Sequence, residues 1–194
     1  MSDFVVGITG ASGSIYGIRL IQELALRKHR VNVAVTSAGK EVMVEELGAP
    51  DFEHLNKLGL SGVGDQIRIW DNDKYEAPFM SGSGAPDAVV VIPCSMGKLA
   101  AIANGISGNL IERTADVALK EKRQLILVVR ETPLNLIHLE NMVKAARAGA
   151  QILPAMPAFY HHPKTVDDMV NFVVGKVLNL LGIEHNLFKG WKKE

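Results

Sequence analysis

The sequence predicts an α/β protein with one domain, built on a doubly wound parallel sheet. Short apolar runs rich in β-branched residues alternate along the chain with amphipathic segments, which is the pattern of a parallel sheet covered by helices. The first apolar run leads through a glycine-rich turn into a helical segment. The chain has 194 residues, a length that fits one domain. We therefore expect residues 1–194 to form a single unit.

The expected strands are short and apolar. The first covers residues 3–9, and the most regular one covers 88–93, where valines dominate and a proline ends the run. Residues 51–84 are rich in Gly, Asp, Ser and Pro, so this segment is expected to be mostly loop. Further strands are expected at 31–36, 67–70, 124–130 and 151–153.

Helices are expected between these strands, because apolar residues recur there with helical spacing. The last helix has a defined start, since Thr165 is followed three residues later by Asp168, the pattern of a capping box. Helices are expected at 15–27, 39–47, 96–104, 109–122, 134–148 and 165–181.

Composition and charge exclude several classes of protein. Twenty-one basic and 21 acidic side chains cancel, so no global positive field attracts nucleic acid. No apolar run approaches the roughly 18 residues of a membrane helix, and the first residues lack the pattern of a signal peptide. Cys94 is the only cysteine, which excludes an internal disulfide and a cysteine metal cluster. We expect a cytoplasmic protein that binds neither nucleic acid nor membranes.

Ligands of doubly wound sheets bind beyond the carboxyl ends of the strands. The first strand ends in GITGASG, from Gly7 to Gly13. Its glycines allow a ligand to approach the backbone, and the next helix could offer its N–H groups to a phosphate. The turn could equally serve only tight packing. The second strand ends in Thr36 and Ser37, two hydroxyls without the carboxylate that binds a ribose diol, so a mononucleotide fits better than NAD.

The third and fourth strand ends also carry polar groups. Ser95 and the amides around Gly97 could bind the polar edge of a ring, with Met96 against its face, although Ser95 could simply cap a helix. Arg130 and Glu131 follow the fourth strand. Opposite charges at the end of an apolar strand are costly unless they are paired or used, so they form either an ion pair or part of a site.

Three of the cations on the expected helices are candidate phosphate contacts. Arg113 and Lys120 are seven residues apart and share a face, with Asp116 between them. They form either a solvated ladder of ion pairs or a pair of cations directed at a phosphate. Lys176 flanks the apolar stripe of the last helix, where it either extends to solvent or reaches a buried anion.

Several segments together resemble the UbiX-type flavin prenyltransferases. The resemblance runs in order from the first strand to Trp191 near the end of the chain. These segments are GASG (10–13), PCS (93–95), NLIER with the following ALKE (109–121), RETP (130–133), IHLEN (137–141) and AFYH (158–161).

The resemblance implies a metal-independent transferase. It joins a dimethylallyl group, delivered as dimethylallyl monophosphate, to N5 and C6 of reduced FMN. The product, prenylated FMN, serves UbiD-type decarboxylases. The resemblance further implies a Rossmann-like or flavodoxin-like three-layer sandwich and a homododecamer with sites between subunits.

The resemblance also assigns roles to positions in this chain. Glu131 matches an acid–base carboxylate, Glu46 a second carboxylate near the substrate, and Ser12 a further catalytic position. Tyr160 and Lys176 match contacts to the prenyl phosphate, with Arg113 and Lys120 nearby. Tyr75 matches an aromatic residue that lines the prenyl pocket, and no residue matches a metal ligand. The matched flavin contacts are Gly10, Ala11, Ser12, Ser37, Ser95, Met96, Gly97, Lys98 and Arg130.

These residue types suit the implied chemistry. Breaking the C–O bond leaves an allylic cation and an anionic phosphate, and without a metal the anion needs Arg, Lys and Tyr donors. Aromatic faces stabilise the cation, and a carboxylate such as Glu131 can take the proton that C6 loses on ring closure. Two positions depart from the family. Lys176 stands where arginine is usual and lacks its bidentate fork, and Lys98 stands where a small hydroxyl residue is common.

Alternatives of other classes are retained. A flavin-dependent cysteine decarboxylase of related fold would carry a PASANT motif, where this chain has PCSMGK at 93–98. A non-catalytic FMN carrier would be indicated by loss of Glu131 or Tyr160. Cys94 could be a nucleophile or a small buried residue. His161 and His162 are adjacent, so their side chains diverge in extended chain and chelate a metal poorly.

Overall fold

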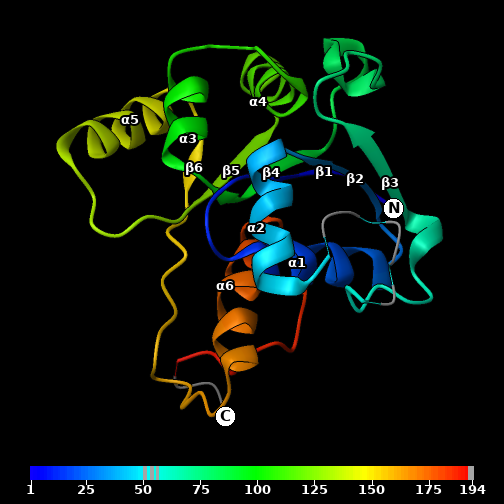
Figure 1. The fold of residues 1–194 in the computed structure, drawn as a ribbon, viewed down its shortest axis with the longest axis vertical. Helices are drawn as coiled ribbons and strands as arrows, with labels where there is room; N and C mark the ends of the chain where they lie inside the picture. Colours follow the sequence, from blue (N-terminus) through cyan, green and yellow to red (C-terminus); the bar gives the residue numbers. More distant parts are fainter. Residues whose placement is uncertain (50–51, 53–54, 56, 192–194) are drawn as a thin grey trace.

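A computed structural model describes residues 1–49, 52, 55 and 57–191. Within these residues it contains a six-stranded parallel sheet in the order β3-β2-β1-β4-β5-β6 (Figure 1). The α/β class and the parallel sheet predicted from sequence are confirmed. The strands are β1 (Asp3–Ile8), β2 (Arg30–Val35), β3 (Ile67–Asp71), β4 (Ala88–Cys94), β5 (Gln124–Val129) and β6 (Gln151–Ile152).

Each predicted helix is present, with its ends within two residues of the expected ones. The capping box at the start of the last helix is confirmed: Thr165 Oγ1 accepts the Asp168 N–H at 3.1 Å, and Asp168 Oδ2 accepts the Thr165 N–H at 2.9 Å. The helices are α1 (Ser14–Leu26), α2 (Ser37–Leu47), α3 (Met96–Ala103), α4 (Leu110–Lys120), α5 (Leu136–Arg147) and α6 (Val166–Leu180).

The segment predicted as mostly loop contains more local structure than expected. Besides β3 it forms short 3-10 turns, of which the second begins at a proline whose fixed φ suits the first position of a helical turn. These turns are η1 (Gly64–Gln66), η2 (Pro78–Met80) and η3 (Gly82–Gly84). Positions 50, 51, 53, 54 and 56 of the expected loop lie outside the described residues.

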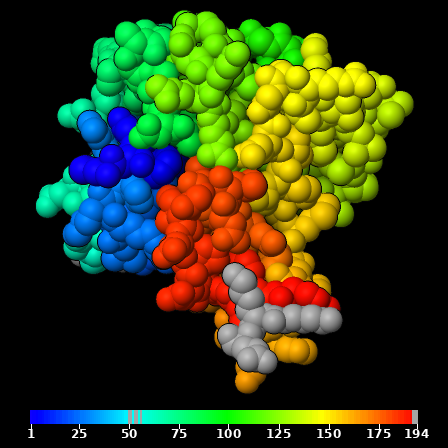
Figure 2. All heavy atoms as spheres, turned by 180° about the vertical axis from the view of Figure 1, so that it is seen from behind, coloured from blue at the N-terminus to red at the C-terminus, as the bar shows by residue number. Residues whose placement is uncertain are grey.

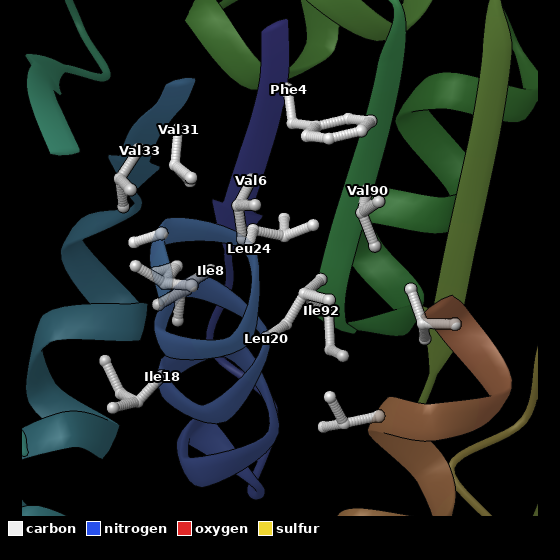
Figure 3. Packing of buried hydrophobic residues seen from close by; sticks show 14 of the residues in the cluster. Phe4, Val6, Ile8, Ile18, Leu20, Leu24, Val31, Val33, Val90 and Ile92 are labelled. Carbon is white, nitrogen blue, oxygen red and sulfur yellow. The ribbon is translucent and has the colours of Figure 1, made fainter. Parts of the chain in front are cut away.

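The central strands β1, β2, β4 and β5 are buried between two layers of helices, because they are largely apolar on both faces. The edge strand β3 is partly exposed. Phe4, Val6 and Ile8 of β1 face the layer formed by α1, α2 and α6, whereas Val5 faces α3, α4 and α5. Figure 3 shows Leu24 of α1 lying against Val6 in the first of these cores. The expected three-layer arrangement is therefore confirmed.

The strand order places a topological switch point at β1. The chain runs outward from β1 through β2 to β3, then returns to the other side of β1 with β4. Connections therefore leave the carboxyl ends of β1 and β4 in opposite directions, which opens a crevice where ligands of such sheets bind. Backbone bonds hold the neighbouring strand ends together, from Thr36 N–H to Ile8 O at 3.0 Å and from Arg130 N–H to Cys94 O at 3.2 Å.

Helix α6 and the segment that leads to it form one flank of the molecule. Viewed from behind, α6 is exposed in orange between the blue N-terminal part and the yellow residues around β6 (Figure 2). None of the helices in the described part of the chain combines the length and hydropathy that crossing a bilayer requires.

Candidate functional site

The turn after β1 lies directly against the start of α2. A Cβ atom added to Gly10 would lie only 2.5 Å from the Cβ of Ala38, a distance that real side chains do not adopt. Ala11 is buried, and its N–H donates to Thr9 O at 2.9 Å. Glycine at position 10 is therefore required by a contact between two protein segments, which is the tight-packing alternative considered for this turn.

Glu46 of α2 reaches back to the N-terminus of α1. Its Oε1 accepts the Gly13 N–H at 2.9 Å, and its Oε2 accepts the Ser14 N–H at 2.8 Å. Partial burial raises the pKa of Glu46, but hydrogen bonds from the Ser12 hydroxyl and from these two amides outweigh burial and bring the pKa below its usual value. The amides that the sequence offered to a phosphate are thus bonded to a carboxylate of the protein itself.

Hydroxyl side chains cap the helices that follow β2 and β4. Thr36 Oγ1 accepts the Gly39 N–H at 3.0 Å, and Ser95 Oγ accepts the Lys98 N–H at 3.4 Å, so the predicted cap at Ser95 is confirmed. Ser37 is exposed at the start of α2. Both helix starts face the crevice at the strand ends.

Two residues at the start of α3 differ in what they offer to a ligand. The Met96 side chain is only 8% exposed and packs in the core under α3. Gly97 is exposed, and a Cβ added there would have no atom within 4 Å. The backbone around Gly97 is therefore open to a ligand, whereas the Met96 side chain supports the turn from below.

The Lys98 side chain points to α4. Its Nζ lies 2.5 Å from Glu112 Oε1, and the two side chains are 14% and 7% exposed. Glu112 Oε2 also accepts the Gly108 N–H at 2.8 Å. Burial raises the pKa of Glu112, but the bonds from Lys98 and Gly108 outweigh it and lower the pKa overall. This ion pair was not anticipated, because the two residues are 14 positions apart on different helices.

Arg130 joins the end of β5 to the turn after β1. Its Nε donates to Ser12 O at 3.1 Å. Glu131 is exposed, and its Oε1 accepts the Thr132 N–H at 3.0 Å. Neither of these bonds links Arg130 to Glu131. Of the two alternatives left open by the sequence, an ion pair or part of a site, the structure therefore does not support the simple ion pair.

Tyr160 and Lys176 lie in a second group beside α6. The Tyr160 ring packs edge-on against Phe172 at 5.8 Å and against Trp191 at 5.4 Å. Lys176 Nζ lies 5.7 Å from the centre of the same Phe172 ring. Lys176 also lines a cavity of about 460 Å³ between α6 and the segment that includes Pro154. Phe172 thus connects the two predicted donor contacts.

The two cations of α4 are each paired with an acidic neighbour in the chain. Arg113 Nη1 pairs with Asp116 at 2.9 Å, and Lys120 Nζ pairs with Glu121 at 2.5 Å, so the predicted ladder through Asp116 forms only in part. Lys120 ends α4 shortly before β5 begins at Gln124. It therefore lies at the amino edge of the sheet, opposite the crevice.

Tyr75 lies in the loop after β3. Its ring is largely exposed, and its hydroxyl donates to Ser107 O at 2.9 Å in the connection between α3 and α4. Cys94, in contrast, is fully buried, and burial raises the pKa of its thiol to about 12. The thiol stays protonated at neutral pH, which excludes a nucleophilic role in this state.

A second residue that sequence reasoning missed, besides Glu112, is Thr9. It is fully buried at the end of β1, where its hydroxyl donates to Pro93 O at 2.7 Å and accepts the Ser95 N–H at 2.8 Å. The sequence signal that could have identified Thr9 is a polar residue at the end of an otherwise apolar strand.

Comparisons with known proteins show which family the chain resembles. The model of the Flavoprotein family matches residues 2–178. A protein named flavin prenyltransferase UbiX from Halalkalibacterium halodurans is 53% identical over 194 residues, which cover 98% of this chain and 94% of that protein.

Two solved structures have the same fold over nearly the whole chain. A UbiX protein in complex with FMN and dimethylallyl pyrophosphate is 36% identical with a TM-score of 0.89, covering 100% of this chain and 98% of that one. A dodecameric FMN-dependent UbiX-like decarboxylase from Escherichia coli O157:H7 is 38% identical with a TM-score of 0.87, covering 98% and 100%. The chain therefore belongs to the Flavoprotein family and, within it, to the UbiX-type flavin prenyltransferases.

Proposed function

We propose that this protein is a flavin prenyltransferase. It transfers a dimethylallyl group from dimethylallyl monophosphate to N5 and C6 of reduced FMN and releases prenylated FMN, without a metal. The observation that carries the proposal is the near-full-length identity of 53% to a flavin prenyltransferase. The crevice at the switch point, lined by two helix starts and Arg130, provides a site of the kind that the reaction needs.

The flavin is assigned to this crevice. The exposed Ser37, the open backbone at Gly97 and the Arg130 guanidinium supply donors for its phosphate and ring edge. Because the Glu46 carboxylate holds the amides of Gly13 and Ser14, the phosphate is better accommodated at the start of α2 than at α1. Gly10, Ala11, Ser12, Ser95, Met96 and Lys98 shape the floor, with Lys98 contributing through its backbone.

The prenyl donor is assigned to Tyr160 and Lys176. When its C–O bond breaks, the electron pair leaves with the phosphate, so positive and hydrogen-bonding groups must meet the growing negative charge. Lys120 lies at the opposite edge of the sheet, so we assign it to a neighbouring subunit's site, together with Arg113 on the same face of α4. Tyr75 then lines the prenyl pocket. The E. coli relative named above is dodecameric, and we assign a homododecamer to this protein as well.

Two carboxylates are assigned to the proton transfer that accompanies bond formation at C6. Formation of the bond to C6 releases the C6 proton, and Glu131 is the assigned acceptor because it is exposed beside Arg130 and the Ser12 turn. Glu46, whose pKa is held low, stays ionised at neutral pH and is the second carboxylate. Ser12 lies between Arg130 and Glu46, since its carbonyl accepts from Arg130 Nε and a hydrogen bond from its hydroxyl lowers the pKa of Glu46.

The test is anaerobic incubation of the protein with reduced FMN and dimethylallyl monophosphate in the presence of a chelator. We expect the mass of the released flavin to increase by one prenyl group, and the Glu131→Gln variant to bind FMN but turn over at least about a hundredfold more slowly. A parallel reaction with the pyrophosphate donor identifies the preferred leaving group. Unchanged flavin with both donors would contradict the proposal and favour a flavin carrier.

A second activity is suggested by the name of the E. coli relative, which is a decarboxylase. It is tested in the same reactions by adding an aromatic acid and measuring CO₂. We expect CO₂ only when a UbiD-type decarboxylase is supplied with the flavin product, because the proposed role of this cytoplasmic protein is to make that enzyme's cofactor.

A further inference from the structure

We propose that Thr9 is a positioning residue that holds the two halves of the flavin crevice at a fixed separation. Its hydroxyl joins the turn after β1 to the turn after β4, so that both turns meet the flavin as one rigid surface. The inference rests on the proposed function, because that function assigns the flavin to these turns.

Such a link is placed at the seam between β1 and β4, the line along which these two strands lie side by side. Backbone pairing of the two strands ends at Gly7 and Val91, before either turn begins. Further along β4, Pro93 has no N–H to donate. The outer seams are closed by backbone bonds, from Thr36 to Ile8 and from Arg130 to Cys94. At the switch point itself, a side chain takes the place of the missing backbone bond.

The Thr9 hydroxyl uses both of its hydrogen-bonding capacities across this seam. It donates to Pro93 O at 2.7 Å and accepts the Ser95 N–H at 2.8 Å. A carbonyl can only accept and an amide can only donate, so the hydroxyl proton has one possible orientation. The Thr9 carbonyl also accepts the Ala11 N–H at 2.9 Å. One fully buried residue thus fixes the backbone of both turns.

Thr9 lies beneath the proposed site and does not line it. Removing the hydroxyl would leave Pro93 O and Ser95 N–H buried without a partner, which is costly enough to make the turns shift or admit water. The candidate flavin contacts at Ser12 and Gly97 would then no longer keep their spacing. The expected consequence is weaker flavin binding, which a role in folding alone would not produce.

The chain offers a matched control for this test. Thr114 is also fully buried, but its hydroxyl donates to Leu110 O at 2.7 Å within its own helix α4. The substitutions Thr9→Val and Thr114→Val therefore delete the same group from equally buried sites. We expect both to lower the Tm, but only Thr9→Val to raise the Kd for FMN, by about tenfold, as measured by quenching of flavin fluorescence.

A substitution that retains the hydroxyl separates its effect on FMN binding from the effect of side-chain shape. Thr9→Ser keeps the hydroxyl and should keep the Kd within about twofold of the wild type. Should Thr9→Val fail to fold, Thr9→Cys, a weaker hydrogen-bonding group of similar size, is compared with Thr9→Ser and should bind FMN more weakly.

The proposal is overturned if Thr9→Val binds FMN as the wild type does, or if Thr114→Val weakens binding equally. It is also overturned if Thr9→Ser binds as weakly as Thr9→Val. A wild-type protein that binds FMN but fails to prenylate it would contradict the proposed function, while the Kd comparison would still decide the role of Thr9.

Discussion

Lys176 carries a compact ammonium group above the ring of Phe172, at a position where the family usually has arginine. A guanidinium offers two parallel donors to a phosphate, whereas an ammonium acts as a point charge. We expect Lys176→Arg to lower the KM for the prenyl donor by about fivefold, the equivalent of roughly one hydrogen bond, with little change in kcat. Steady-state kinetics at saturating reduced FMN measures this effect.

Lys28→Arg is the control, because Lys28 lies in the turn between α1 and β2 and does not line the cavity beside Lys176. It should leave both constants unchanged. An unaltered KM in Lys176→Arg would mean that the ammonium already satisfies the donor phosphate, or that Lys176 does not meet it.

Single residues differ in how well the sequence predicts their roles. Helix caps such as Ser95 and Thr165 can be predicted from the sequence, because their hydroxyls accept from amides three positions later in the chain. For Gly10 the sequence left ligand approach and tight packing open, and its close approach to Ala38 requires the fold to be seen. Thr9 was missed because its partners lie more than 80 positions away. Local partners can be inferred from the sequence, whereas distant ones require the fold.

Helices α3 and α4 are joined by the buried pair of Lys98 and Glu112. Replacing one partner leaves the other charge buried without its counterion, at a cost of about 3 kcal/mol. We therefore expect Lys98→Met to lower the free energy of unfolding by roughly that amount at pH 7. The double variant with Glu112→Gln should lose less, because no orphan charge remains. Urea unfolding at one fixed protein concentration measures both.

The effect of Lys98→Met should depend on pH. The folded protein lowers the pKa of Glu112, so this carboxylate stabilises the fold above its ordinary pKa and loses that contribution as pH falls through the lowered value. The difference between wild type and Lys98→Met should accordingly be largest at neutral pH and shrink in acid. A difference that is constant with pH would assign the effect to packing.

Elements were predicted more reliably than residues. Strands such as β4 are short, uniformly apolar runs and the helices have apolar stripes, so each signal is spread over many positions. The turns between residues 64 and 84 were missed because a 3-10 turn of three residues carries almost no periodic signal.

At the scale of the whole molecule, the position of Lys120 at the amino edge of the sheet predicts sites shared between subunits. Two variants, Glu131→Gln and Lys120→Met, should each be inactive alone. When they are co-expressed in equal amounts and assemble at random, about a quarter of shared sites should contain both intact residues. Prenylation assays on the mixed oligomer measure this recovery.

Mixing the two variants after each has assembled separately is the control and should restore nothing while subunits do not exchange. If co-expression also restores nothing, Lys120 and Glu131 do not act in one shared site.

The oligomer illustrates the limit of sequence reasoning at this scale. Layer order follows from strand and helix alternation, but which surfaces meet depends on shape, and the dodecamer was inferred only from family resemblance.

The contact between Glu46 and the start of α1 makes ligand binding there an exchange of anions. The amides of Gly13 and Ser14 are already saturated by a tethered carboxylate at high effective concentration. Any anionic ligand that takes these amides must displace Glu46 into solvent, so its affinity reflects the difference between two anions. Glu46 thus competes with any anionic ligand for these amides. Only a ligand that makes further contacts elsewhere in the crevice can displace Glu46 with a net gain in binding free energy.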